Sequence, residues 1–334
     1  GLINFDSREQ MLGVSALYSS IAYTLFGEHL CEITFSSAGA VAGKLKTPTE
    51  TLAVGEGWLT TALGHIQTHI SDFVAAGGTD AEARALPYSI TTDVVDMIYA
   101  LRARTRWAMG DATGAVSDAT QVAQGFVAWV TRNAGLEDER ENHVWLMHGE
   151  TAANLYADVA GPVDWWTDPL GTAPGAPWPL FVDSLGIAGP QALIPFTGYR
   201  ELAIEDATGR AVDVAGNAIT IGAGSTLDSR VDVQFGAELT DGNTGWVQQK
   251  YATAGEAIAL VKWQEMAFIR AMADPANAAA RINEVRTAAG LTNVTYAPAG
   301  DEITNMILEE VRREHFLESR LWPWKIRHQL TADP

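Results

Sequence analysis

The sequence predicts a mostly α-helical fold, in which tetratricopeptide-like helical repeats carry a loop-rich region with short β-hairpins. Apolar residues recur at helical spacing through the first half, proline and glycine are frequent from about residue 160 to 250, and helical spacing then returns. We expect one domain over residues 1–334, with a helical-repeat half at 1–160, a loop-rich insertion at 161–250 and C-terminal helices at 251–334. A chain of 334 residues with 47% hydrophobic content can bury a core of that size.

Helical spacing is clearest in the first half, at residues 8–29, 57–78 and 91–110. Gly27 is expected to stop the first helix. The pair Gly77–Gly78 is expected to end the second, because glycine adopts the left-handed backbone conformation found after many helices. Thr91 or Thr92 is expected to cap the third helix.

Small residues indicate how these helices pair. Ala103, Gly110 and Ala115 stand at the offsets that a tetratricopeptide helix pair requires. Small side chains let two helices approach closely, and the Gly-Asp step at 110–111 suits a tight turn between them. Tyr23 and Gly27 occupy matching offsets in an earlier helix, so the sequence predicts a helical-repeat scaffold.

The stretch from 161 to 250 is rich in proline, glycine and tryptophan, so no long helix is expected there. Short β-favouring pieces and turn residues at 201–224 predict a hairpin or two. The candidate ligand-binding residues in this region are Trp165, Trp166, Trp178 and Trp246. Aromatic rings stack on sugars and also anchor protein interfaces, and they fill cores under long loops, so all three roles stay open.

The C-terminal helices follow from 254 onward. Asp274–Pro275 should divide the stretch 254–291 into two helices, because proline is tolerated only in the first turn, and the second should close at Gly290. A final helix is expected over 301–329, capped by Asp301. Glu309 and Glu310 are each spaced to pair with Arg313, which predicts a salt-bridged, exposed flank on this helix.

Composition excludes several classes of function. The 22 Lys and Arg against 41 Asp and Glu give a formal net charge of −19, which repels phosphate backbones, so we predict no nucleic-acid partner. No apolar run is long enough for a membrane-spanning helix. The first ten residues lack the basic and apolar regions of a signal peptide.

Catalytic motifs are also missing from the sequence. His65 and His69 are one helical turn apart, but no glutamate at protease spacing and no third ligand accompany them, so we expect solvated histidines rather than a zinc site. Cys31 is the single cysteine and is expected to be a small buried hydrophobe. The 41 acids offer many carboxylate pairs, yet nothing singles one out for glycoside hydrolysis. We therefore predict no catalytic residue, no metal and no cofactor.

Two C-terminal motifs and the N-terminal helix resemble a known family. The motif residues are Ile282, Asn283, Val285, Arg286, Ala289, Gly290 and Leu291, followed by Ile307, Glu310, Arg312, Arg313, Glu314, Glu318 and Arg320. They are similar to the closing motifs of RagB/SusD-family nutrient-uptake lipoproteins, and the stretch 23–32 resembles a repeat helix of that family. In the family, the helix that carries these acids and bases is structural rather than catalytic.

The resemblance implies a SusD-like fold and a non-enzymatic role. It implies an outer-membrane, cell-surface lipoprotein that captures glycans or other oligomeric nutrients for a TonB-dependent, SusC-like transporter. Cys31 does not stand in a lipid-attachment context, so the lipid anchor is expected on a residue outside this chain. The alternative is an extracellular or cell-surface structural protein that self-associates, with the loop tryptophans buried between copies.

Overall fold

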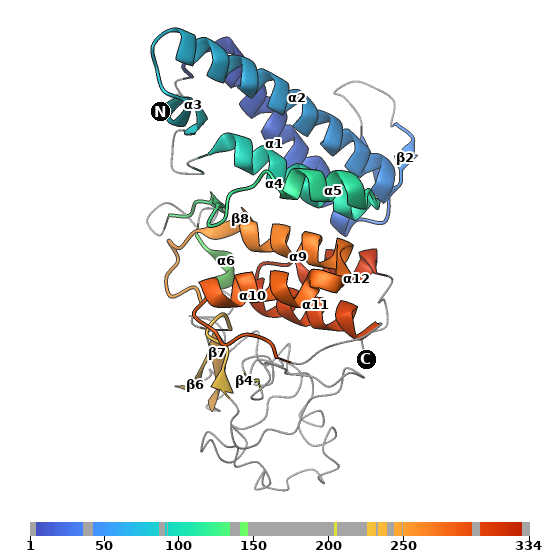
Figure 1. The fold of residues 1–334 in the computed structure, drawn as a ribbon, viewed down its shortest axis with the longest axis vertical. Helices are drawn as coiled ribbons and strands as arrows, with labels where there is room; N and C mark the ends of the chain where they lie inside the picture. Colours follow the sequence, from blue (N-terminus) through green and yellow to red (C-terminus); the bar gives the residue numbers. More distant parts are fainter. Residues whose placement is uncertain are drawn as a thin grey trace, which may run out of the picture. The chain divides into compact units, whose positions relative to one another are not determined.

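The computed structural model describes residues 5–35, 43–86, 91, 93–133, 141–145, 204–205, 226–231, 233–238, 244–248, 250–295 and 301–328. The chain forms two compact units (Figure 1). Unit 1 comprises Gly1–Val130, Ala259–Ala278 and Arg320–Pro334, and unit 2 comprises Thr131–Ile258 and Ala279–Ser319. The described elements are mostly helices with a few short strands, which confirms the predicted fold class. The expected boundaries at residues 160 and 250 stay a prediction.

Unit 1 begins with two long helices that pack against each other, α1 (Arg8–His29) and α2 (Pro48–Ala75) (Figure 1). They run antiparallel, since Gly13 faces Ile66 and Gly27 faces Leu52. A Cβ atom at Gly27 would stand 2.5 Å from Leu52 Cγ, so this glycine permits close helix packing. The expectation that Gly27 stops the helix is wrong, because α1 continues to His29.

The second helix starts earlier than its apolar spacing predicts. Thr47 and Glu50 form a capping box, in which Glu50 N–H donates to Thr47 Oγ1 at 3.3 Å and Thr47 N–H donates to Glu50 Oε2 at 2.8 Å. These reciprocal bonds satisfy backbone groups at the helix start. The prediction of a start at residue 57 missed this box.

Three further helices follow in unit 1, α3 (Asp80–Arg84), α4 (Val94–Met109) and α5 (Ala112–Ala119). Asp93 caps α4 by accepting hydrogen bonds from the N–H groups of Val95 and Asp96, so the assignment of the cap to Thr91 or Thr92 was wrong. Thr91 instead accepts from Asp93 N–H at 3.1 Å.

The α4–α5 pair bears out the small-residue pattern. Gly110 has φ 93° in the turn, and Asp111 caps α5. Ala103 and Ala115 are fully buried, which allows the two helices to approach closely.

The rest of unit 1 comprises the strands β1 (Ile33–Thr34), β2 (Leu45–Lys46) and β3 (Val127–Val130), and the C-terminal elements. β3 pairs with β8 (Ile258–Lys262), which leads directly into α9 (Trp263–Ala273). The expected helix from residue 254 is therefore wrong over 258–262. A 3-10 turn at Pro275–Asn277 separates α9 from α10 (Ala278–Ala288), as the Asp274–Pro275 step predicts.

Helix α12 (Leu321–Arg327) contributes an aromatic contact to unit 1. Trp324 is 2% exposed, and its ring centroid lies 5.7 Å from that of Trp107 on α4. Arg327 donates to the Trp107 carbonyl at 3.0 Å. Together these contacts hold α12 against α4.

Unit 2 contains α6 (His143–Trp145), the strands β4 (Ile204–Glu205) and β5 (Thr226–Leu227), the hairpin of β6 (Val233–Glu238) and β7 (Thr244–Gln248), and the helices α10 and α11 (Asp301–Glu314). Both strand pairs are antiparallel, and β4 lies within the stretch where a hairpin was predicted. The single helix expected over 301–329 is instead two. α11 ends at Glu314, and Leu317 and Ser319 adopt φ values of 60° and 56° before α12 begins.

Candidate functional site

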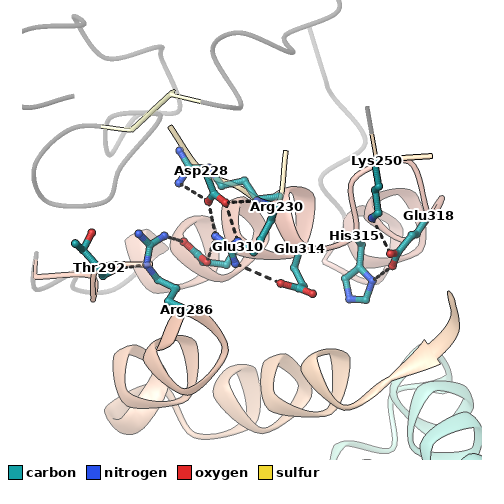
Figure 2. A network of polar contacts seen from close by, with 10 residues as sticks. Asp228, Arg230, Lys250, Arg286, Thr292, Glu310, Glu314, His315 and Glu318 are labelled. Atoms are coloured by element: carbon teal, nitrogen blue, oxygen red, sulfur yellow. Dashed lines mark hydrogen bonds and ion pairs between the residues drawn. The ribbon is translucent and has the colours of Figure 1, made fainter. Parts of the chain in front are cut away.

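The acids and bases of α11 take part in a network of ion pairs within unit 2 (Figure 2). Glu310 forms ion pairs with two arginines. Its Oε1 lies 2.9 Å from Nη1 of Arg286 on α10, and its Oε2 lies 2.8 Å from Nη2 of Arg230 in the segment after β5. Arg230 also holds Asp228 at 2.6 Å and faces Glu314 at 3.6 Å. Helix α11 is thereby tied to two other parts of the chain.

A second group lies toward the end of α11 (Figure 2). Lys250 Nζ donates to the carbonyl of Phe316 and to Glu318 Oε1, both at 2.7 Å. His315 Nδ1 lies 2.8 Å from the other oxygen of Glu318. These bonds hold the turn in which the backbone leaves the helical conformation.

The burial of these charges corrects one expectation. Glu309 and Arg313 do pair, at 3.4 Å, as their spacing predicts. They do not form an exposed flank, because Glu309 is 7% exposed, Glu310 1% and Arg313 0%. Desolvated charges must be paired to be tolerated, and the network supplies the partners.

Asp228 is stabilised in its charged form by the arginine beside it. Burial alone would raise the pKa of Asp228, but the hydrogen bond and charge of Arg230 outweigh it and lower that pKa. A general acid or base needs a pKa near the working pH, and Asp228 is moved away from it. Asp228 thus serves as a counter-charge for Arg230, in keeping with the structural role that the resemblance implies for the motif on α11.

A second buried chain of ion pairs lies in unit 1. Arg320 donates to both oxygens of Glu28 at 2.7 Å and to Glu265 at 3.0 Å. Glu265 also accepts from Arg104 Nε at 3.0 Å. Arg320 and Glu28 are 292 residues apart, and both belong to the stretches that resemble the family motifs. They join the first and last helices of the unit.

The two histidines of α2 contact the start of α1. His65 lies 2.6 Å from Glu9 and His69 lies 2.9 Å from Ser7, so α1 engages both rings. The expectation of solvated histidines is wrong for His69, which is 1% exposed. The described residues contain no cluster of three His, Cys, Asp or Glu side chains that could hold a metal ion.

The structure also tests the expected burial of Cys31 and the expectation about membrane-spanning helices. Cys31 is exposed, not buried, because it follows the end of α1 instead of lying within it. Across the ranges that the structure describes, no helix is both long and apolar enough to cross a membrane.

The predicted ligand-binding tryptophans fall mostly outside the described residues. This is the case for Trp165, Trp166 and Trp178. Trp246 lies on β7, opposite Phe235 of β6, next to an irregularity in register between Phe235 and Ala237. Bulges of this kind are common beside binding sites, because they redirect the strand. The binding role of all four tryptophans stays a prediction.

Comparison with solved structures shows which known fold the chain has. A SusD-like carbohydrate binding protein from Bacteroides vulgatus ATCC 8482 aligns with a TM-score of 0.52 at 14% identity, over 96% of this chain and 63% of that chain. A SusD-like protein from Bacteroides fragilis NCTC 9343 aligns with a TM-score of 0.52 at 14% identity, over 96% and 69%. A SusD-like carbohydrate binding protein from the same strain gives 0.57 at 11% identity, over 96% and 68%.

The chain therefore has a SusD-like fold, as its sequence predicts. It spans less than two thirds of the length of the first of these structures. No protein-family model matches the sequence, and no curated protein matches it in sequence. The similarity to these structures is therefore one of fold.

Proposed function

We propose that this chain is a non-enzymatic binding protein that captures glycans or other oligomeric nutrients. The observation that carries the proposal is the SusD-like fold, which extends over 96% of the chain and is shared with two proteins described as carbohydrate binding. Three charged residues of α11 support it as well, because Glu309, Glu310 and Arg313 are buried in ion pairs, as structural residues are.

The proposed binding surface is the loop-rich region with Trp165, Trp166, Trp178 and Trp246. Aromatic faces pack against the C–H surfaces of sugar rings, and single contacts of this kind are weak, so several rings are needed for an oligomer. The proposal extends to the cell surface: the protein would be held at the outer membrane by a lipid anchor. There it would pass ligand to a TonB-dependent, SusC-like transporter.

Intrinsic tryptophan fluorescence tests ligand capture. The protein is titrated with soluble oligosaccharides and peptides, alongside Trp165→Ala/Trp166→Ala. The matched control is Trp58→Ala/Trp129→Ala, which removes two tryptophans that are each 40% exposed and lie outside the loop-rich region. We expect a saturable change with one ligand in the wild type and the control, and its loss in the loop variant. No saturable response to any ligand, or an unchanged loop variant, would contradict the proposal.

Self-association is the second candidate function, and an exposed stripe on α1 favours it. Met11, Tyr18 and Leu25 are 42%, 45% and 41% exposed and follow one another at seven-residue intervals, so they share one face of the helix. Apolar surface of this kind often marks an interface. Sedimentation over a range of concentrations tests it: a mass that rises with concentration and returns to the monomer in Tyr18→Glu supports assembly. A monomer at every concentration excludes it.

A further inference from the structure

A cavity of about 280 Å³ opens in unit 1 between α2, α3, α4 and the turn after α5. Its polar lining combines an acid, a base, two amides and a phenol, contributed by Asp96, Arg84, Gln67, Gln121 and Tyr99. Ile70 and Val95 add aliphatic surface. Pockets for drug-sized ligands start at about 300 Å³, so this cavity suits a small molecule rather than an oligomer.

Asp96 is the most unusual group in the lining. Asp96 is only 7% exposed, and one of its carboxylate oxygens accepts a hydrogen bond from Ala123 N–H at 3.0 Å. Among the residues that the structure describes, no lysine or arginine lies within ion-pair distance of it. Burial raises the pKa of Asp96, and the hydrogen bond from Ala123 offsets this only in part. A carboxylate has about four acceptor sites, so most of this acid's capacity is available to a ligand.

The charges around the cavity select against anionic ligands. Arg84 is held by Asp80 at 2.6 Å and by Asp93 at 3.2 Å, so its positive charge is already compensated by two carboxylates. An anionic ligand would meet the carboxylate of Asp96 without a free cation to offset the repulsion. A neutral ligand avoids this penalty.

The hydrogen-bonding groups point to the chemistry of that ligand. Asp96 only accepts hydrogen bonds, Arg84 only donates, and the amides of Gln67 and Gln121 do both. A hydroxyl group both donates and accepts, so a ring that carries several hydroxyls can satisfy all of them. The ring of Tyr99, which Arg102 approaches at 5.5 Å from the centroid, and the neighbouring aliphatic side chains suit the C–H faces of such a ring.

We propose that this cavity binds one neutral, hydroxyl-rich ring of about the size of a single pyranose unit. The site is formed entirely by residues of unit 1 and uses none of the four loop tryptophans. It therefore goes beyond the function proposed above, and each of the two can fail without the other.

Saturation-transfer NMR and calorimetry with three probes test the proposal. Methyl β-glucopyranoside and methyl α-mannopyranoside are neutral, and glucuronate is anionic. We expect saturable binding of at least one neutral glycoside, with a dissociation constant on the order of 1 mM for a ligand of this size. Glucuronate should bind more weakly than that glycoside.

Variants assign the binding to the cavity. Asp96→Asn keeps the shape and an oxygen for Ala123, and should weaken binding about tenfold because a charged acceptor is lost. Gln121→Ala removes an exposed amide, which leaves the fold intact, and should weaken binding several-fold. Trp165→Ala/Trp166→Ala should bind the glycoside as the wild type does. The proposal is overturned if no neutral glycoside saturates the wild type, if glucuronate binds as tightly, or if Gln121→Ala and Asp96→Asn leave the affinity unchanged.

Discussion

Replacing Arg320 with methionine should destabilise unit 1 strongly. The guanidinium is 6% exposed and holds Glu28 through two hydrogen bonds of 2.7 Å and Glu265 through one of 3.0 Å. Methionine keeps an apolar chain of similar length but removes the cation. Glu28 then stays buried without the charge that compensates it, and Glu265 keeps Arg104.

The free energy of unfolding should fall by about 3–5 kcal/mol, which is typical when one partner of a buried ion pair is removed. With a denaturant slope of about 3 kcal/mol per molar urea, the unfolding midpoint should fall by about 1–1.7 M. Urea unfolding followed by circular dichroism measures this shift. Arg281→Met is the matched control, because Arg281 and Glu284 form a pair with side chains 36% exposed, and its loss should stay below about 1 kcal/mol.

A double-mutant cycle separates the ion pair from the packing of the arginine chain. Glu28→Gln should cost less in the Arg320→Met background than in the wild type, since its cation is already gone; the difference should be about 1–3 kcal/mol. Additive effects, or an Arg320→Met loss no larger than that of Arg281→Met, would refute the reasoning.

Three other changes test separate parts of the structure. Gly27→Ala should lower the free energy of unfolding by about 1–3 kcal/mol, measured by thermal unfolding, because its Cβ would stand 2.5 Å from Leu52 Cγ. Gly64→Ala has open space around it and should instead stabilise α2 by about 0.5–1 kcal/mol. Arg230 lowers the pKa of Asp228 in the folded protein despite the opposing effect of burial. The ionised Asp228 therefore stabilises the fold fully above its unfolded pKa of about 3.9, and this stabilisation is lost as pH falls through the lower folded pKa. Asp228→Asn should therefore flatten the acid-unfolding curve below about pH 4, and an unchanged slope there would contradict this. Cys31 should react fully with a thiol reagent in the native protein, and protection would contradict its exposure.

Local patterns in the sequence predicted the helices well and their starts poorly. Apolar spacing placed α1 and α4 correctly, because a helix that packs on a core must repeat its apolar residues at about 3.6 positions. The start of α2 lies in the capping box of Thr47 and Glu50, a polar signal outside the apolar run. Boundaries depend on such single hydrogen bonds, so they are the least predictable part of a helix.

The strand at 258–262 shows a second limit. A short apolar stretch such as Ile258–Leu260 fits a buried strand or the start of a helix equally well. The pairing of β8 with Val127–Val130 decides between them, and that partner lies more than a hundred residues earlier. Periodicity within a window cannot contain this information.

The charges of the C-terminal motif give the clearest case of correct pairing with the wrong burial. The spacing of Glu309 and Arg313 predicted their contact, because residues four apart meet on a helix. Their burial depends on partners that no helical window contains: Arg286 on α10, and Asp228 and Arg230 after β5. The sequence of this helix alone therefore predicts that its acids and bases form a solvated flank.

Burial also explains why these residue types are needed. A desolvated carboxylate tolerates little change in its partner. A guanidinium can pair with two carboxylates at once, because its donors form a fixed fork. Arg320 pairs in this way with Glu28 and Glu265, and Arg230 with Asp228 and Glu310. A lysine at either place would offer one point charge and no such geometry. The motif is thus a requirement of the fold, and neither of the two proposed ligand sites, at the loop tryptophans and in the cavity beside Asp96, uses its residues.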